Sequence, residues 1–372
     1  MRGPIVITGG GTAGHVFPMQ AIAEQLRAYG VEGADLRFVG SRRGQEAALL
    51  KTSGVALTLL SGRGLQRSIR PTAVLQNAVA VAGLVTAVVV ATMKVAKWRP
   101  SVVVSVGGYA SFAVALAAVL WRRPLVLIEL DATPGAAHRL LGRFAHTRCC
   151  AFASTERNAV VTGAPLRQSV LAIDRSMEAR RRARAAAVPP IEEGRLVVVV
   201  VTGSLGSASV NRAVVELAER WRFRRDRTLV HVTGRRDFTT ITSSRPVTDG
   251  LDYRLEEFGD MARLWALCDV AVCRAGATTV AELTTLAIPS ILVPLPGAPG
   301  DHQTMNALSV AEVGGARLIV DADCHGASLE EALNVVATTD SLVAMARAAG
   351  SLGRRDATEA IATIVCEVGG WS

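Results

Sequence analysis

The stretch IVITGGGTAGH, residues 5–15, decides how the first half of the chain folds. Its first four residues are all β-branched and predict a buried strand, and the glycines after them have the G-x-G-x-x-G spacing at Gly9, Gly11 and Gly14. A helical pattern then runs from Pro18 to Tyr29. Glycines let backbone N–H groups approach a phosphate, and a helix N-terminus supplies positive potential. This order therefore predicts a phosphate-type site in an α/β domain.

The alternation of short apolar runs with longer helical segments continues along the chain. A run of five valines at 197–201 restarts the plan in the second half. The expected strands are residues 4–8, 36–40, 55–60, 102–105 and 125–129 in the first half and 196–202, 228–233, 252–255, 270–274, 290–294 and 317–320 in the second. This alternation predicts two doubly wound parallel sheets with helices on both faces, and a boundary between Gly163 and Leu196.

Composition limits the partners. The length of 372 residues fits two domains, and a hydrophobic fraction of 50% is typical of a folded globular chain. Residues 1–170 hold 19 Lys and Arg against 7 Asp and Glu, a net charge of +12, and the remaining residues hold 22 against 25, a net charge of −3. A basic half indicates an anionic partner, or else a solvated basic face in an Arg-rich chain. Because aromatic residues make up only 4%, we expect no nucleic-acid partner.

Two long stretches carry no charge, residues 72–93 and 101–121. Both are long enough to span a bilayer. The second contains Gly107-Gly108 after a predicted strand, and the first contains several polar or small residues. We therefore expect a buried or membrane-facing helix rather than a spanning one. The basic residues that flank the first stretch would suit an anionic bilayer surface: Arg67, Arg70, Lys94, Lys97 and Arg99.

The first glycine loop leaves two functions open. His15 follows the last glycine directly, which suits acid–base chemistry beside a phosphate, although a structural hydrogen bond at a helix start explains it equally well. Arg42 and Arg43 follow the second predicted strand, where an NADP-dependent oxidoreductase would place them. A second loop, Gly203 to Gly206, weakens the oxidoreductase reading, because hydride transfer needs only one dinucleotide site.

Two motifs follow later strands. In CRAGATTVAE, residues 273–282, a helix start can hold an anion and Glu282 can accept hydrogen bonds from a ribose. In PLPGAPGDHQTMNA, residues 294–307, a Pro/Gly loop delivers polar residues to a helix start, where Asp301 would be a simple N-cap. Neither the six cysteines nor Asp321-Ala322-Asp323 has convincing metal-site spacing, so we expect no metal.

Taken together, these motifs resemble those of the MurG family of bacterial GT-B glycosyltransferases, over essentially the whole chain. The donor segments at 273–282 and 301–307 match most specifically, and residues 10–15, 107–109 and 163–167 also match. The resemblance implies two Rossmann-like domains facing a cleft, over residues 1–165 and 166–345, with a helix in 346–372 packing back on the first domain.

The same resemblance implies an activity. A UDP-sugar hexosyltransferase of this family moves N-acetylglucosamine, with inversion, from UDP-N-acetylglucosamine to the C4 hydroxyl of undecaprenyl-diphospho-N-acetylmuramoyl-pentapeptide. This step turns lipid I into lipid II in peptidoglycan synthesis and so serves cell shape and division. No cofactor would be required. The enzyme would be peripheral on the cytoplasmic face of the membrane, with the polyprenyl-diphosphate acceptor and an anionic lipid surface as partners.

The resemblance also implies roles for individual residues. His15 and Glu129 are the candidate catalytic bases. The residues expected to bind the donor are Thr12, Gly14, Asp131, Arg167, Ser204, Phe258, Gly276, Thr278, Glu282 and Gln303. The residues expected to form the acceptor loop are Gly11, Gly107, Gly108 and Tyr109.

The chain departs from the family pattern near the expected sugar. The family usually has His-Glu-Gln-Asn where this chain has Ile128-Glu129-Leu130-Asp131, and Gly-Gly-Ser-Gln-Gly where it has TGSLG at 202–206. Leu205 lacks an amide that could contact the donor. A divergent member, a glycosyltransferase with another lipid or natural-product acceptor, and a non-catalytic nucleotide-sugar binder all fit this pattern.

Overall fold

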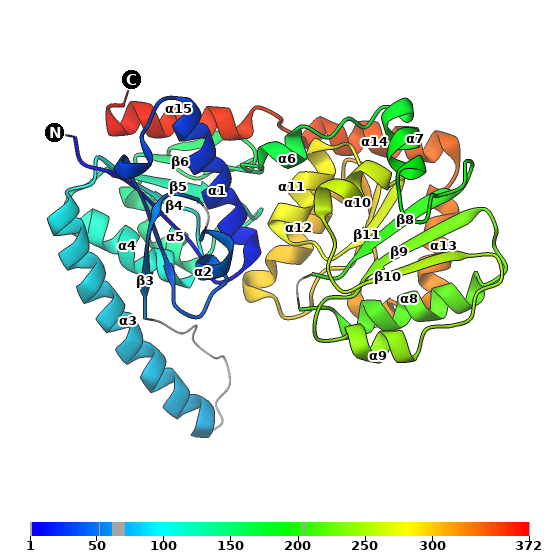
Figure 1. Ribbon diagram of the computed structural model, residues 1–372. Coiled ribbons are helices and arrows are strands. Elements are labelled where there is room, and N and C mark those ends of the chain that lie inside the picture. Colours follow the sequence, from blue (N-terminus) through cyan, green and yellow to red (C-terminus); the bar gives the residue numbers. More distant parts are fainter. Residues whose placement is uncertain (1, 52, 62–70, 204, 372) are drawn as a thin grey trace. The chain divides into compact units, whose positions relative to one another are not determined.

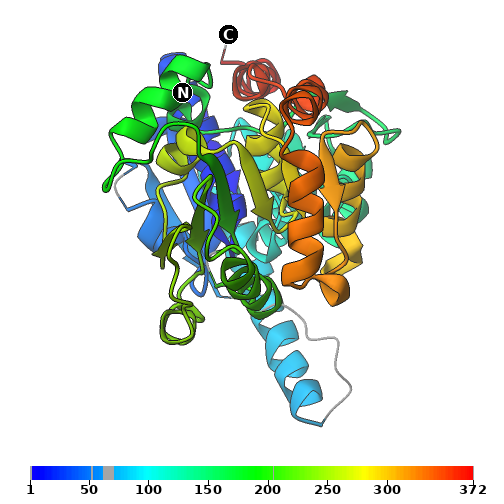
Figure 2. The ribbon, with the colours of Figure 1, turned by 90° about the vertical axis from the view of Figure 1, so that its right-hand side faces the viewer.

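The computed structural model describes all residues except 1, 52, 62–70, 204 and 372, with side chains also left out at 71–79 and 109. It contains two compact units, residues 1–167 with 354–372 and residues 168–353. Each unit is one parallel sheet covered by helices (Figure 1, Figure 2). The predicted pair of doubly wound parallel-sheet domains is confirmed. The expected boundaries after residues 165 and 345 differ from these divisions by two and eight residues.

The first unit has a seven-stranded sheet in the order β3-β2-β1-β4-β5-β6-β7. Its strands are β1 (Ile5–Thr8), β2 (Leu36–Ser41), β3 (Ala56–Leu60), β4 (Val102–Ser105), β5 (Leu125–Glu129), β6 (Thr147–Cys150) and β7 (Ala159–Val161). Its α-helices are α1 (Ala13–Ala28), α2 (Glu46–Leu49), α3 (Pro71–Trp98), α4 (Tyr109–Leu120), α5 (Ala136–Leu141) and α15 (Ala357–Gly369). The strands β6 and β7 are absent from the predicted set, because β6 contains polar Thr147 and Arg148 and β7 is only three residues long.

The second unit has a six-stranded sheet in the order β10-β9-β8-β11-β12-β13. Its strands are β8 (Leu196–Val201), β9 (Arg227–Val232), β10 (Asp252–Glu256), β11 (Val270–Cys273), β12 (Ser290–Leu292) and β13 (Ala316–Leu318). Its α-helices are α6 (Gln168–Leu171), α7 (Met177–Ala185), α8 (Ala208–Arg220), α9 (Phe238–Ser243), α10 (Met261–Leu267), α11 (Ala277–Thr285), α12 (His302–Ala311), α13 (Gly326–Val336) and α14 (Thr339–Leu352). The valine run lies in β8, where both faces are buried.

Each sheet has one point where the strand order reverses. In the first unit it lies between β1 and β4, and in the second between β8 and β11. Chain connections leave in opposite directions there, so the carboxyl ends of the two strands border an open crevice where doubly wound proteins bind ligands. The glycine loops at 9–14 and 107–108 follow β1 and β4 in the first unit. The Gly203–Gly206 loop and the CRAG segment at 273–276 follow β8 and β11 in the second unit.

The two uncharged stretches have different structures. The second forms β4 and α4, and the first lies within α3, which extends beyond the sheet in Figure 1. One face of α3 packs into the core through Ala87, Ala91 and Val95. An opposite stripe, spaced four residues apart, is between 49% and 67% exposed: Val81, Val85, Val89 and Met93. Among the described residues, Ala80–Trp98 is the one helix long and apolar enough to cross a membrane.

The last helix belongs to the first unit. α15 lies beside α1 in Figure 1 and contacts it. The Thr358 hydroxyl accepts a hydrogen bond from the Leu166 N–H at 2.9 Å and donates one to the Leu166 carbonyl at 3.0 Å. Farther along, the Trp371 indole N–H donates to Ser101 Oγ at 2.8 Å. These bonds hold the end of the chain against the segment that leaves the first sheet.

A buried polar chain crosses the second unit below its glycine loop. Asn211 Nδ2 donates to the Thr233 carbonyl at 3.0 Å, so the Asn211 Oδ1 accepts from His231 Nε2 at 2.9 Å. His231 Nδ1 then accepts from the Tyr253 hydroxyl at 2.9 Å. The neutral imidazole satisfies both partners, and burial lowers the pKa of His231 to about 3.

This pKa shift predicts acid-sensitive stability. The unfolded chain binds a proton at His231 near pH 6.5 and the folded chain does not, so the stability conferred by neutral His231 is lost as pH falls from 6.5 toward 3. Between pH 7 and pH 5 the free energy of unfolding should fall by about 2 kcal/mol more in the wild type than in His231→Gln. Urea denaturation at several pH values measures this, with the exposed His146→Gln as control. Equal pH dependence in the wild type and His231→Gln would contradict the assignment.

Candidate functional site

The first glycine loop is held by a buried carboxylate. Glu46 Oε1 accepts the Gly11 N–H at 3.0 Å and the Ser41 N–H at 2.8 Å, and the Glu46 side chain is fully buried. A Cβ at Gly10 or Gly44 would lie 1.8 Å from Glu46 oxygens, so glycines surround this side chain. No motif points to Glu46; the only sequence signal is an acid among glycines that follow a strand. Gly11 has open space on its Cα, where its predicted acceptor role would be exercised.

The two glycine loops touch each other. A Cβ at Gly108 would lie 2.2 Å from the Gly10 carbonyl oxygen, and Gly108 has a φ of +84°. Any other residue would clash and would also strain the backbone. The predicted acceptor-loop residues Gly11, Gly107 and Gly108 are thus brought together at the carboxyl ends of β1 and β4. The side chain of Tyr109 lies outside the described residues.

His15 lies in the first turn of α1, half-buried, with Gly14 before it. Its Nδ1 is 3.3 Å from the Thr12 hydroxyl. A Cβ at Gly107 would lie 3.5 Å from His15 Nε2, so the imidazole packs against the Gly107-Gly108 loop. The structure therefore gathers the predicted residues Thr12, His15 and Gly107, with His15 Nδ1 beside a hydroxyl and its Nε2 beside the glycine loop.

Glu129, the other candidate base, is at the end of β5 and is buried. Its Oε2 is 3.0 Å from His138 Nδ1, and His138 Nε2 is 2.8 Å from Ser105 Oγ. The Glu129 side chain is 6% exposed and the His138 side chain 4%. No predicted motif includes His138 or Ser105. The order serine, histidine, carboxylate is that of a nucleophilic triad, but Ser105 is fully buried, so no substrate reaches its hydroxyl.

The family departures on β5 and just after it have a structural cause. Ile128 is 1% exposed and Leu130 is 5% exposed, so both side chains fill the core. Asp131, predicted to face the sugar, is half-buried just beyond the strand. Arg167 belongs to the first unit, where its guanidinium carbon lies 3.9 Å from the centre of the Phe17 ring. The predicted roles of Asp131 and Arg167 toward the donor remain predictions.

In the second unit Arg274 joins the ends of three segments. Its Nη1 donates to the carbonyls of Val293 at 3.1 Å and Pro294 at 3.0 Å, and its Nη2 donates to Ser209 Oγ at 3.0 Å. The guanidinium also pairs with Asp321 at 2.6 Å. This arrangement fixes the ends of β11 and β12 against the start of α8. Asp321, one of the two aspartates in the 321–323 segment, is therefore engaged in a salt bridge.

A buried hydrogen bond fixes the predicted donor segment after β11. Glu282 is 5% exposed, and its Oε2 accepts the Trp265 indole N–H at 2.7 Å. Gly276 precedes α11, and a Cβ there would meet nothing within 4 Å. Thr278 lies in the first turn of α11, half-buried. The helix N-terminus therefore faces open space without a side-chain cap, an arrangement that suits a phosphate.

The segment after β12 is fixed by amides. The Leu295 N–H donates to Gln303 Oε1 at 3.0 Å, and Asn306 Nδ2 donates to the Ala275 carbonyl at 3.1 Å. Asp301 precedes α12 with a φ of +53° and accepts the Thr304 hydroxyl at 2.7 Å, but makes no backbone cap. Simple N-capping therefore does not explain Asp301. Asn306 ties α12 to the β11 loop, so the two donor motifs form one structure.

Two predicted donor residues remain. Phe258 follows β10 and is 48% exposed, with the Arg235 guanidinium carbon 5.2 Å from its ring centre. Ser204 lies outside the described residues. Its neighbours Gly203 and Gly206 both have positive φ, and Leu205 is 68% exposed. Exposed Leu205 does not contribute to the core, so the departure at this position falls on a surface near the β8 loop.

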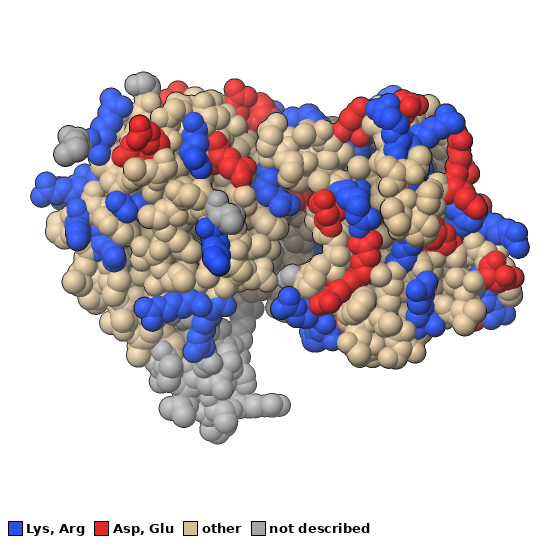
Figure 3. All heavy atoms as spheres, in the orientation of Figure 1, with Lys and Arg blue, Asp and Glu red and all other residues tan. Residues whose placement is uncertain are grey.

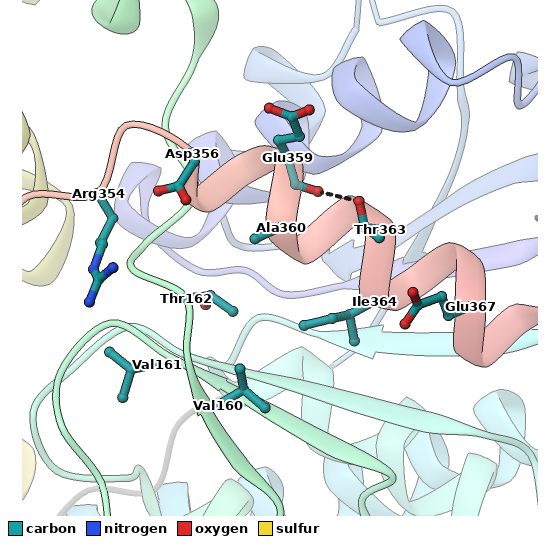
Figure 4. Close-up of a pocket in the computed structure, with 10 residues that line it drawn as sticks. All are labelled: Val160, Val161, Thr162, Arg354, Asp356, Glu359, Ala360, Thr363, Ile364 and Glu367. Atoms are coloured by element: carbon teal, nitrogen blue, oxygen red, sulfur yellow. Dashed lines mark hydrogen bonds between the residues drawn. The ribbon is translucent and has the colours of Figure 1, made fainter.

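Other features mark where the site does not lie. A hollow of about 460 Å³ between β7 and α15 is lined mainly by Val160, Val161, Asp356, Glu359 and Glu367 (Figure 4). Its three carboxylates outnumber its one guanidinium, that of Arg354, so the lining does not suit an anionic ligand. In the described part of the chain, no group of three or more His, Cys, Asp or Glu residues could hold a metal ion. On the face drawn in Figure 3, basic side chains spread over the first unit, with acidic ones near its top, and both signs intermix on the second unit.

Comparison with known proteins places the chain. Residues 5–149 match the glycosyltransferase family 28 N-terminal domain and residues 197–361 match the C-terminal domain. A Moorella thermoacetica protein named UDP-N-acetylglucosamine--N-acetylmuramyl-(pentapeptide) pyrophosphoryl-undecaprenol N-acetylglucosamine transferase is 33% identical over 377 residues, covering 97% of this chain and 98% of its own. A Salinibacter ruber protein of the same name is 36% identical over 364 residues, covering 96% and 95%.

Solved structures agree on the fold. MurG of Acinetobacter baumannii superposes with a TM-score of 0.76 at 24% identity, over 98% of this chain and 99% of that one. The calicheamicin glycosyltransferase CalG4 superposes with a TM-score of 0.67 at 16% identity, over 99% of each. The two domain matches and the full-length relatives go further than the fold, and they decide against the oxidoreductase reading. The chain belongs to glycosyltransferase family 28 and, within it, to the MurG family.

Proposed function

We propose that the chain transfers N-acetylglucosamine from UDP-N-acetylglucosamine to the C4 hydroxyl of undecaprenyl-diphospho-N-acetylmuramoyl-pentapeptide, making lipid II from lipid I. The observation that carries this proposal is identity of 33% and 36%, over nearly the full length, to relatives named for that transfer. The bond from the sugar C1 to the UDP phosphate breaks, and a bond from C1 to the acceptor oxygen forms. The acceptor hydroxyl loses its proton, and UDP leaves with the electron pair.

The second unit supplies the donor chemistry. The uncapped N-terminus of α11 at Gly276 offers N–H groups to the diphosphate, where negative charge grows as UDP leaves. The Trp265 indole N–H holds the Glu282 side chain in one conformation, so its carboxylate is preorganised to accept hydrogen bonds from a ribose. Phe258, exposed beside Arg235, offers a flat surface to the uracil. We infer that these groups bind the donor without a metal or cofactor.

The first unit supplies the acceptor chemistry. His15 is the candidate base because its imidazole is half-buried and lies between Thr12 and Gly107, and histidine is the side chain most often used as a general base. We propose that Nε2, which lies beside Gly107, takes the proton of the acceptor hydroxyl, while Nδ1 lies beside the Thr12 hydroxyl. Glu129 is buried, with its Oε2 bonded to His138, and does not reach a substrate directly.

We further propose that the first unit binds the cytoplasmic membrane surface peripherally. The exposed stripe on α3 presents Val85, Val89 and Met93, and Lys94 and Lys97 lie in the same helix near its end. Apolar side chains entering the interface and cations beside anionic lipid headgroups stabilise binding together. A surface-lying helix accounts for the packed side of α3, which a spanning helix would not have.

The direct test of the reaction is transfer of radiolabelled sugar from a panel of UDP-sugars to the lipid-linked acceptor. We expect product from UDP-N-acetylglucosamine, and release of UDP only when acceptor is present. UDP, but not NADP, should raise the melting temperature. A donor preference for another sugar, or transfer only to another acceptor, would replace the proposed substrates while leaving the family assignment intact.

Removal of the candidate base should separate turnover from binding. In His15→Ala, kcat should fall about 100-fold or more, the loss expected for a general base. The stabilisation by UDP should persist, because the proposed UDP-binding residues of the second unit, Gly276, Glu282 and Phe258, are unchanged. Steady-state kinetics and thermal melting measure the two effects. Turnover at the wild-type rate would remove His15 from the mechanism.

Membrane binding has its own variant. Val85→Asp combined with Val89→Asp should reduce sedimentation with anionic vesicles about tenfold or more, because each buried apolar contact is replaced by a charge repelled by the lipid. Val343→Asp changes a valine that is 57% exposed in the second unit and serves as control. Equal sedimentation of both variants would contradict the assignment of α3 as the lipid-binding face.

A further inference from the structure

Two members of the buried chain Ser105–His138–Glu129, Ser105 and His138, belong to no predicted motif. Ser105 ends β4, Glu129 ends β5, and His138 comes from α5, which packs against α4. The two hydrogen bonds that link them are 2.8 Å and 3.0 Å long. All three side chains are at most 6% exposed. The chain therefore joins the ends of two neighbouring strands beneath the loop that follows β4.

This chain leads to His15. A Cβ at Gly107 would lie 3.5 Å from His15 Nε2 and 3.7 Å from His138 Cε1, so both imidazoles border the same small space at Gly107. Gly107, which has a φ of +96°, thus adjoins both the His138 ring and the His15 ring. Any displacement of His138 would therefore release both the loop and the His15 ring.

The Glu129 carboxylate is costly to keep as a simple structural group. Its Oε1 is buried and has no hydrogen-bond partner. A buried acceptor left without a partner destabilises the folded state. An apolar side chain of similar size would avoid this cost, so the benefit of Glu129 lies in what its Oε2 does to His138. By accepting from Nδ1, the carboxylate fixes the ring orientation and directs Nε2 to Ser105.

We propose that His138 is a positioning residue, held by Glu129 and Ser105, that sets the Gly107-Gly108 loop against His15. Glu129 then acts through His138 and is not the base that takes the acceptor proton. This inference rests on the proposed transfer reaction. It names a further residue, His138, on which turnover depends without contact with either substrate.

Paired variants distinguish a positioning role from a base. Glu129→Gln keeps an oxygen that can accept the Nδ1 hydrogen bond, so kcat should stay within about threefold of the wild type. Glu129→Ala leaves the imidazole unheld, and kcat should fall about tenfold or more through misplacement of His15. KM for UDP-N-acetylglucosamine should not change in either variant. If Glu129 were the base, Glu129→Gln would lose as much activity as Glu129→Ala, and this result would overturn the proposal.

A second measurement does not depend on turnover. The imidazole Hε1 resonance of His15, assigned with His15→Gln, should shift in Glu129→Ala and His138→Ala and remain in place in Glu129→Gln. The exposed His146→Ala serves as control, and stabilisation by UDP shows that each variant is folded. An unmoved His15 resonance in Glu129→Ala would overturn the proposal. Absence of transfer by the wild type with the resonance shifts as expected would instead overturn the proposed function alone.

Discussion

The contact between the Gly10 carbonyl and the Cα of Gly108 is the constraint on which the first unit's site depends. A Cβ at Gly108 would lie 2.2 Å from the Gly10 carbonyl oxygen, so the loops after β1 and β4 can approach this closely only because residue 108 is glycine. Their approach narrows the crevice at the reversal of strand order and places His15 against Gly107. Glu46 fixes one loop from α2, and the Ser105–His138–Glu129 chain fixes the other from α5. Hydrogen bonds from buried polar side chains thus restrain two loops whose glycines would otherwise leave the backbone flexible.

The second unit solves the same problem with a cation and amides. Arg274 binds carbonyls at the end of β12 and hydroxyls at the start of α8, and Asn306 binds the loop after β11. These bonds leave the N-terminus of α11 open at Gly276. An acceptor site needs a proton acceptor held at one distance, and a donor site needs positive potential with free N–H groups. The hydrogen bonds that position His15 in the first unit therefore suit an acceptor site. The bonds that leave the N-terminus of α11 open in the second unit suit a donor site.

Most of the fold follows from pattern, because β-branched runs between glycine loops and helices leave few alternatives. The strand β6 escapes prediction because Arg148 interrupts its sequence, and β7 escapes it because its apolar run is only three residues long. The candidate site is predictable where a motif is contiguous, as at His15, Gly107, Gly276 and Glu282. It is not predictable where the partner comes from elsewhere in the chain: Glu46 reaches Gly11 across 35 residues, and Ser105 reaches His138 across 33. The departures at Ile128 and Leu130 attract notice in the sequence, yet both side chains lie in the core.

The central claim is that UDP binds at the β8/β11 reversal of the second unit while the β1/β4 reversal is left for the acceptor. Methyl resonances of Leu, Val and Ile during a titration with UDP test it most directly. We predict that the resonances of Leu205, Val280 and Leu295 shift with saturation, while those of Val16 and Val106 do not. Saturable shifts confined to Val16 and Val106 would contradict the account.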